Sequence, residues 1–171
     1  IGGKSGARGV RLTAMVARLK SHYSALEAAY SPSGIGGVAT QVWTPLEKDD
    51  LLHCYGSTAK ALEGLKKLIT ERQAQEIRGF CAYCGIGAPR QFDHYLPKGK
   101  FPEFSVHSYN LIPCCSSCNG LKSEVWLQGN GQRAFINFYI DSLPTEPMLE
   151  PEVLWSVKNG KRVPVVSFEL V

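Results

Sequence analysis

Four cysteines stand in two pairs that have the spacing of metal ligands. Cys81 and Cys84 form one C-x-x-C pair, and Cys115 and Cys118 form a second. Two such pairs can present four thiolates to one tetrahedral zinc ion, which is then structural because no coordination position stays open. A redox-active thiol pair has the same spacing but does not need a second copy. Cys114 adjoins the second pair, but the spacing to Cys118 favours Cys115 as the ligand.

The segment between the two pairs carries side chains suited to phosphodiester hydrolysis. This reaction needs oxygen ligands for a hard divalent cation and a base that is neutral near neutral pH. Asp93 and His94 offer a carboxylate and an imidazole, and Asn119 directly follows the second cysteine pair. Neighbouring strand residues point to opposite faces, so Asp93 and His94 reach one site only at a strand end, which Pro97 supplies. We expect Asp93 and Asn119 to hold Mg²⁺ while His94 activates water.

Three lysines lie close in sequence to these residues. Phosphodiester cleavage places negative charge on the substrate phosphate, and nearby ammonium groups neutralise that charge. We therefore expect contacts to substrate phosphates from Lys98, Lys100 and Lys122.

Between residues 80 and 124 the sequence resembles the HNH endonuclease family, which has a ββα-metal fold. Matched by position, His94 is the first motif residue, Asn110 the second and Asn119 the third, in an H-N-N variant. The resemblance implies that His94 is the general base and that Asn110 orders the loop that orients it. It also implies that Asp93 and Asn119 are the catalytic metal ligands. Asparagine at the last position favours Mg²⁺ or Mn²⁺ over a softer metal.

The resemblance implies an activity and partners as well. It implies metal-dependent hydrolysis of DNA phosphodiester bonds. The helical N-terminal part and the Pro-rich segment 143–147 are similar to stand-alone bacterial HNH proteins, some of which act with a partner ATPase in anti-phage defence systems of the Septu type. The alternative is a zinc-knuckle interaction or nucleic-acid-binding module with a degenerate HNH fold. Against that alternative stands the intact set of Asp93, His94, Asn110 and Asn119.

Three helices are expected before the first cysteine pair. Apolar residues recur at steps of three and four from Arg11 to Tyr30, and a segment rich in Gly, Ser and Pro follows at 31–37. Two further helices are expected at Leu46–Tyr55 and Ser57–Arg78. The last of them carries three lysines, which we interpret as a solvated helix face in preference to a DNA-binding surface: Lys60, Lys66 and Lys67.

We expect a short helix from about Ser117, within the second cysteine pair, and, near the end of the chain, a β hairpin. Its strands, Val153–Val157 and Arg162–Leu170, flank Asn159-Gly160, a pair suited to a type I′ turn. The fold class expected is therefore α+β. Its regions are a helical N-terminal part (1–79), a zinc-stapled ββα core (80–126) and a C-terminal part with the hairpin (127–171).

Composition places few limits on function. Hydrophobic residues make up 44% and charged residues 20% of the chain, an ordinary balance for a globular protein. The net charge of +4 permits binding to nucleic acid without requiring it. No apolar run is long enough to span a membrane, so no membrane partner is expected. Paired cysteines that bind metal are typical of the reducing cytoplasm, which is the location we expect.

Overall fold

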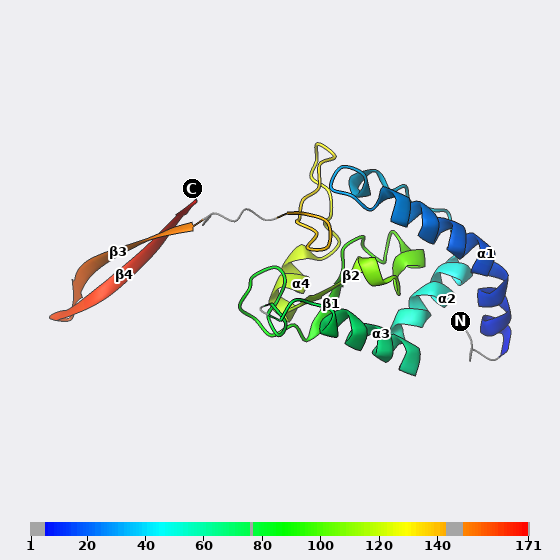
Figure 1. Ribbon diagram of the computed structural model, residues 1–171, viewed down its shortest axis with the longest axis horizontal. Helices are drawn as coiled ribbons and strands as arrows, with labels where there is room; N and C mark the ends of the chain where they lie inside the picture. The colour runs from blue at the N-terminus through cyan, green and yellow to red at the C-terminus, as the bar shows by residue number, and fades with distance from the viewer. Residues whose placement is uncertain (1–5, 76, 143–148, 171) are drawn as a thin grey trace. The chain divides into compact units, whose positions relative to one another are not determined.

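The computed structural model describes residues 6–75, 77–142 and 149–170. This part of the chain contains four α-helices and two antiparallel two-stranded sheets, so the expected α+β class is confirmed (Figure 1). The helices are α1 (Gly6–Ala29), α2 (Pro45–Gly56), α3 (Lys60–Glu71) and α4 (Ser116–Lys122). The strands are β1 (Gln91–His94), β2 (Leu111–Cys114), β3 (Leu149–Lys158) and β4 (Lys161–Leu170). Three short 3₁₀ turns are η1 (Ile35–Gly37), η2 (Pro102–Phe104) and η3 (Ser108–Asn110).

The chain divides into two compact units, Ile1–Asp141 and Ser142–Val171. The first unit contains the four helices and the β1–β2 sheet, and the second contains the β3–β4 hairpin. The Pro-rich segment 143–147 lies outside the described residues. Within the described ranges, no helix combines the length and apolar character that crossing a bilayer requires.

Helix α1 buries one face along its whole length. Leu12, Met15, Leu19 and Leu26 follow one another at helical spacing, and all four are buried. The first three form a small core with Leu51 of α2, whereas Leu26 belongs to a second and larger core. The helix predicted from apolar periodicity is thus confirmed, with an earlier start than expected.

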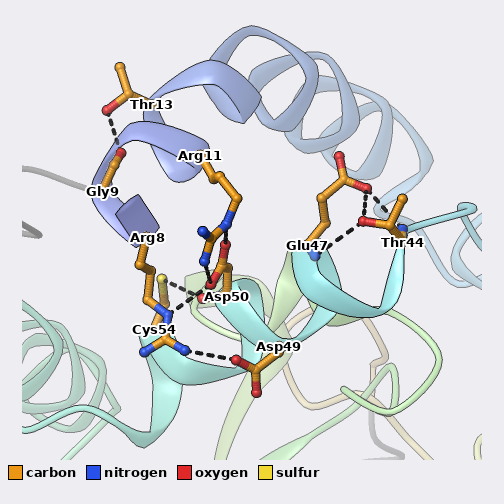
Figure 2. Close-up of polar contacts among 9 residues, drawn as sticks. All are labelled: Arg8, Gly9, Arg11, Thr13, Thr44, Glu47, Asp49, Asp50 and Cys54. Atoms are coloured by element: carbon orange, nitrogen blue, oxygen red, sulfur yellow. Dashed lines mark hydrogen bonds and ion pairs between the residues drawn. The ribbon is translucent and has the colours of Figure 1, made fainter. Parts of the chain in front are cut away.

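Helix α2 begins where its sequence supplies a cap. The Thr44 hydroxyl accepts a hydrogen bond from the Glu47 amide, and the Glu47 carboxylate accepts one from the Thr44 amide (Figure 2). This reciprocal pair satisfies two amides that the first helical turn leaves without partners. Pro45 stands at the first helical position, where its missing N–H costs nothing.

Helix α3 is shorter than the predicted helix at Ser57–Arg78, and that prediction is wrong at both ends. The helix ends at Glu71, and the chain then forms turns. The Arg78 guanidinium donates to the carbonyl oxygens of Glu71 and Gln73. A side chain from the following turn therefore satisfies carbonyls that a longer helix would have bonded through its own amides.

A buried carboxylate joins α1 to α2. The Asp50 side chain has no solvent exposure and accepts hydrogen bonds from Arg8 Nε (2.8 Å) and Arg11 Nη2 (2.9 Å), as Figure 2 shows. The hydrogen bonds from Arg11 and then those from Arg8 lower the pKa of Asp50 to about 2. Because the guanidinium groups stay one-third exposed, they retain part of their hydration while they pair with this buried charge.

We predict that Asp50→Asn lowers the free energy of unfolding by about 2 kcal/mol at neutral pH. Removing one partner of a fully buried pair costs about 3 to 5 kcal/mol, and the partial exposure of both arginines reduces that cost. The carboxylate has a lower pKa in the folded state, so its stabilisation is complete above pH 4 and disappears as the pH falls toward 2. Urea unfolding of wild type and variant at pH 7 and pH 3 measures this. An equal difference at both pH values would contradict the prediction.

Strands β1 and β2 and helix α4 form one compact arrangement, in which β2 pairs with β1 and α4 contacts β1 (Figure 1). Asp93 lies opposite Ile112, and His94 lies opposite Leu111 in the antiparallel pair. Helix α4 packs on β1. It is the short helix that was predicted from about Ser117, and that prediction is confirmed. The larger core lies beside this arrangement and consists of Leu26, Ile35, Tyr95, Leu96, Phe101, Phe104, Ile112 and Trp126.

The C-terminal hairpin turns at the predicted pair. Asn159 and Gly160 both have positive φ angles, 52° and 72°, as a type I′ turn requires, and glycine adopts such angles without strain. The strands are longer than the sequence predicted and pair along their whole length. One face of the hairpin carries exposed apolar side chains from both strands, namely Pro151, Val153, Trp155, Pro164, Val166 and Phe168.

Candidate metal centre and cleft

The four predicted zinc ligands lie together. The Sγ atoms of Cys81, Cys84, Cys115 and Cys118 are all within 4.8 Å of one another, and none of these four residues is in a disulfide. Zinc–sulfur bonds of about 2.3 Å place the sulfurs of a tetrahedral site about 3.8 Å apart. The separation of 4.0 Å between the Cys84 and Cys115 sulfurs is close to that value. The four-cysteine cluster could therefore hold a metal such as zinc.

Backbone amides donate to two of the four sulfurs, although burial raises the pKa of the Cys118 thiol in the same cluster. The Gly87 amide donates to Cys84 Sγ at 3.4 Å, and the Cys118 amide donates to Cys115 Sγ at 3.5 Å. Hydrogen bonds from the amides of Gly87 and Ile86 lower the pKa of Cys84 to about 6, which favours the thiolate. Gly87 also allows close approach, since a Cβ there would lie 2.7 Å from the Cβ of Cys115.

Asp93 and His94 leave β1 on opposite faces, as strand geometry requires. Asp93 is buried, and its carboxylate accepts hydrogen bonds from Tyr83 Oη at 2.7 Å and Lys122 Nζ at 3.2 Å. The Lys122 ammonium also donates to the backbone carbonyl of His94 and lies 3.0 Å from Asp93 Oδ2. Both carboxylate oxygens thus have protein partners, so a cation bound at Asp93 would compete with the Lys122 ammonium for the same negative charge.

The position of Lys122 differs from the one that we expected. Its side chain is 1% exposed, so as placed it faces the interior and not a substrate phosphate. The reason is the α4 helix itself, which puts Lys122 one turn after Asn119 on the face that packs against β1. The buried negative charge of Asp93 then stabilises the ammonium group there.

Asn119 contacts the same strand. Its amide nitrogen donates to the side-chain oxygen of Gln91 at 2.7 Å, so its own oxygen is the atom that could bind a cation. Gln91 and Asp93 are two residues apart on β1 and therefore share a face. Gln91 and Asp93 on this face of β1, together with Asn119 from α4, therefore offer side-chain oxygens of the kind that Mg²⁺ prefers.

His94 is held as a neutral imidazole beside the cleft. Its Nε2 lies 3.0 Å from the carbonyl oxygen of Ser105. A carbonyl only accepts hydrogen bonds, so Nε2 carries the proton and the lone pair is on Nδ1. The ring of Tyr55 packs edge-on against His94 at 4.4 Å. Burial is the main cause that lowers the pKa of His94, to about 4, so the imidazole is neutral at pH 7.

Asn110 fastens the loop that ends at Ser105. Its side-chain oxygen accepts from the Leu96 amide at 2.7 Å, and its nitrogen donates to the carbonyls of Leu96 and Phe104 at 3.0 and 3.1 Å. The side chain is buried, so each of these bonds is protected from water. Because Phe104 directly precedes Ser105, Asn110 also holds in place the carbonyl that orients His94.

One open cleft of about 940 Å³ brings several of these residues together. Of the expected site residues it is lined by Asp93, His94, Lys98 and Asn119. Asn110, Lys100 and Lys122 are not among its lining residues. The far wall comes from the end of α2 and from α3, and includes Tyr55 and Lys66.

Three residues that contact the expected site residues were not predicted from the sequence. Gln91 could have been found, because it stands two residues before Asp93 in a strand. Tyr55 carried no local signal, since it is half-buried and lies in a helix that precedes β1 by a long stretch of chain. Tyr83 also carried no signal for this role, because it lies inside the first cysteine pair, yet its hydroxyl donates to Asp93.

Comparison with known proteins gives a partial relationship. No family model matches the chain, and no solved structure matches it. The chain is 44% identical over 63 residues to Protein ea31 of Escherichia phage lambda. That stretch is 36% of this chain and 21% of the phage protein, so the chain spans about one fifth of the curated relative that it matches.

Proposed function

We propose that the protein is a metal-dependent endonuclease of the HNH type that hydrolyses phosphodiester bonds in DNA. The observation that carries the proposal is the environment of His94. This imidazole is neutral, has its lone pair on Nδ1, is fixed through Nε2 and lines an open cleft. A neutral imidazole with a fixed ring and a lone pair on Nδ1 can accept a proton from water in the cleft. The oxygen-bearing side chains of Asp93 and Asn119 and an exposed lysine, Lys98, line the same cleft and support the same proposal.

In the proposed reaction, Nδ1 of His94 takes a proton from a water molecule as that water attacks phosphorus. The hydrogen bond from Nε2 to Ser105 keeps the ring oriented and stabilises the imidazolium that forms. Lys98 neutralises charge on the phosphate. A divalent cation, when bound by Asp93 and Asn119, would stabilise charge on the phosphate and on the leaving oxygen. At Asp93 it would compete with the Lys122 ammonium for the charge of the carboxylate.

The test is incubation of the purified, zinc-loaded protein with supercoiled plasmid in EDTA, Mg²⁺ or Mn²⁺. We expect nicked and linear products with Mg²⁺ or Mn²⁺ and none in EDTA. Plasmid that is bound but uncut in every condition would favour the alternative, a nucleic-acid-binding module with an inactive HNH fold. Cleavage that persists in EDTA would contradict the metal-dependent mechanism.

The proposal extends to a partner ATPase in an anti-phage defence system, which the resemblance to stand-alone HNH proteins suggests. Its test compares the plasmid cleavage rate of the purified chain with and without an ATPase encoded beside it. An unchanged cleavage rate would contradict the proposed role of the ATPase as a partner.

A further inference from the structure

The polar face of α3 forms the wall of the cleft that faces the β1–α4 side. The α3 residues that line the cleft are Glu63, Lys66, Lys67, Thr70 and Glu71. Their spacing of three and four residues puts them on one face of the helix. Two of the three lysines that the sequence suggested to be a solvated face, Lys66 and Lys67, therefore share a cleft with His94.

Tyr55 connects this wall to the imidazole. Its ring contacts His94 edge-on at 4.4 Å, and its hydroxyl donates to the backbone carbonyl of Phe92 at 3.3 Å. The ammonium groups of Lys66 and Lys98 lie 5.0 and 4.9 Å from the centre of the same ring. One aromatic ring thus fixes two cations, one from each wall, close to His94.

The ion pair of Lys66 with Glu63, which would compete with a phosphate, is weak. Glu63 Oε1 is 3.5 Å from Lys66 Nζ, and the Glu63 side chain is 65% exposed. An exposed pair at this distance contributes little free energy, so a phosphate can replace the carboxylate. The Lys66 side chain itself is only 25% exposed, because its stem lies along the wall while its ammonium faces the tyrosine ring.

We infer that α3 is a strand-binding wall, in which Lys66 contacts the phosphate backbone of a nucleic acid that passes between α3 and β1. The inference rests on the proposed nuclease function for its substrate class. It assigns to α3, which lies outside the strand–strand–helix arrangement, the task of holding the strand against His94. A lysine that neutralises one phosphate releases counterions, so its removal lowers the salt dependence of binding by a predictable amount.

The test measures binding of a fluorescent 30-nucleotide DNA, as a single strand and as a duplex, in EDTA over a range of NaCl concentrations. Lys66→Gln should reduce the slope of log K against log salt by about 0.7 to 0.9 and weaken binding several-fold at low salt. Lys66→Arg should restore both. The control is Lys60→Gln, the same change at an exposed residue of α3 outside the cleft, and it should leave the slope unchanged. Comparison of the two affinities shows whether the protein prefers single-stranded or duplex DNA.

The outcomes separate this inference from the proposed function. An unchanged slope in Lys66→Gln overturns the inference even if the wild type cleaves plasmid. A reduced slope supports the inference even if no condition gives cleavage, and the nuclease proposal then fails alone. Absence of DNA binding by the wild type overturns the inference.

Discussion

Replacing His94 by alanine is expected to lower the rate of metal-dependent plasmid cleavage by about 10²- to 10⁴-fold, the usual contribution of a general base. Nδ1 of His94 carries the lone pair that would accept the proton from water, and alanine removes it. The zinc content should not change, because His94 is not one of the four clustered ligands. The measurement is the initial rate at saturating Mg²⁺, together with zinc content and the melting temperature.

A matched control separates the loss of chemistry from the loss of packing. His107 is also a buried histidine, which contacts Tyr23 edge-on at 4.5 Å and does not line the cleft. His107→Ala should destabilise the fold by an amount similar to His94→Ala and yet keep the wild-type cleavage rate at a temperature where both variants are folded. Cleavage by His94→Ala at the rate of His107→Ala would contradict the assigned mechanism.

The second large effect is expected from the zinc ligands. Cys115→Ser should abolish zinc binding and the cooperative unfolding transition of the first unit. Structural zinc contributes about 10 to 16 kcal/mol in small zinc domains, as much as the whole stability of an ordinary domain. Cys115 also caps α4, because its sulfur accepts from the Cys118 amide, so its loss affects the start of the helix that carries Asn119. Zinc per chain and thermal unfolding followed by circular dichroism measure both effects.

Cys114→Ser is the control for that experiment. Cys114 is the neighbouring cysteine, is completely buried in β2 and lies outside the four-sulfur cluster. The variant should keep one zinc ion per chain and unfold cooperatively at a lower temperature. A zinc-free wild type with an unchanged melting transition would show that the cluster does not stabilise the fold through a metal.

Features that depend on short stretches of chain could be predicted from the sequence. The two C-x-x-C pairs predicted the four-sulfur cluster because each pair forms one turn. Asn159-Gly160 predicted the hairpin because few residues adopt its φ angles. The periodic apolar residues of α1 likewise act within a few turns of helix.

Which side chains from distant parts of the chain meet depends on how the helices and strands pack. Lys122 reads as a surface lysine in sequence, but packing of α4 on β1 buries it beside Asp93. Lys66 reads as solvated, but the placement of α3 puts it over Tyr55 and into the cleft with His94. The physical reason is that periodicity and capping report only on local backbone geometry. The burial of a charge depends on a partner of opposite charge that another element supplies, and that partner is not visible in the local sequence.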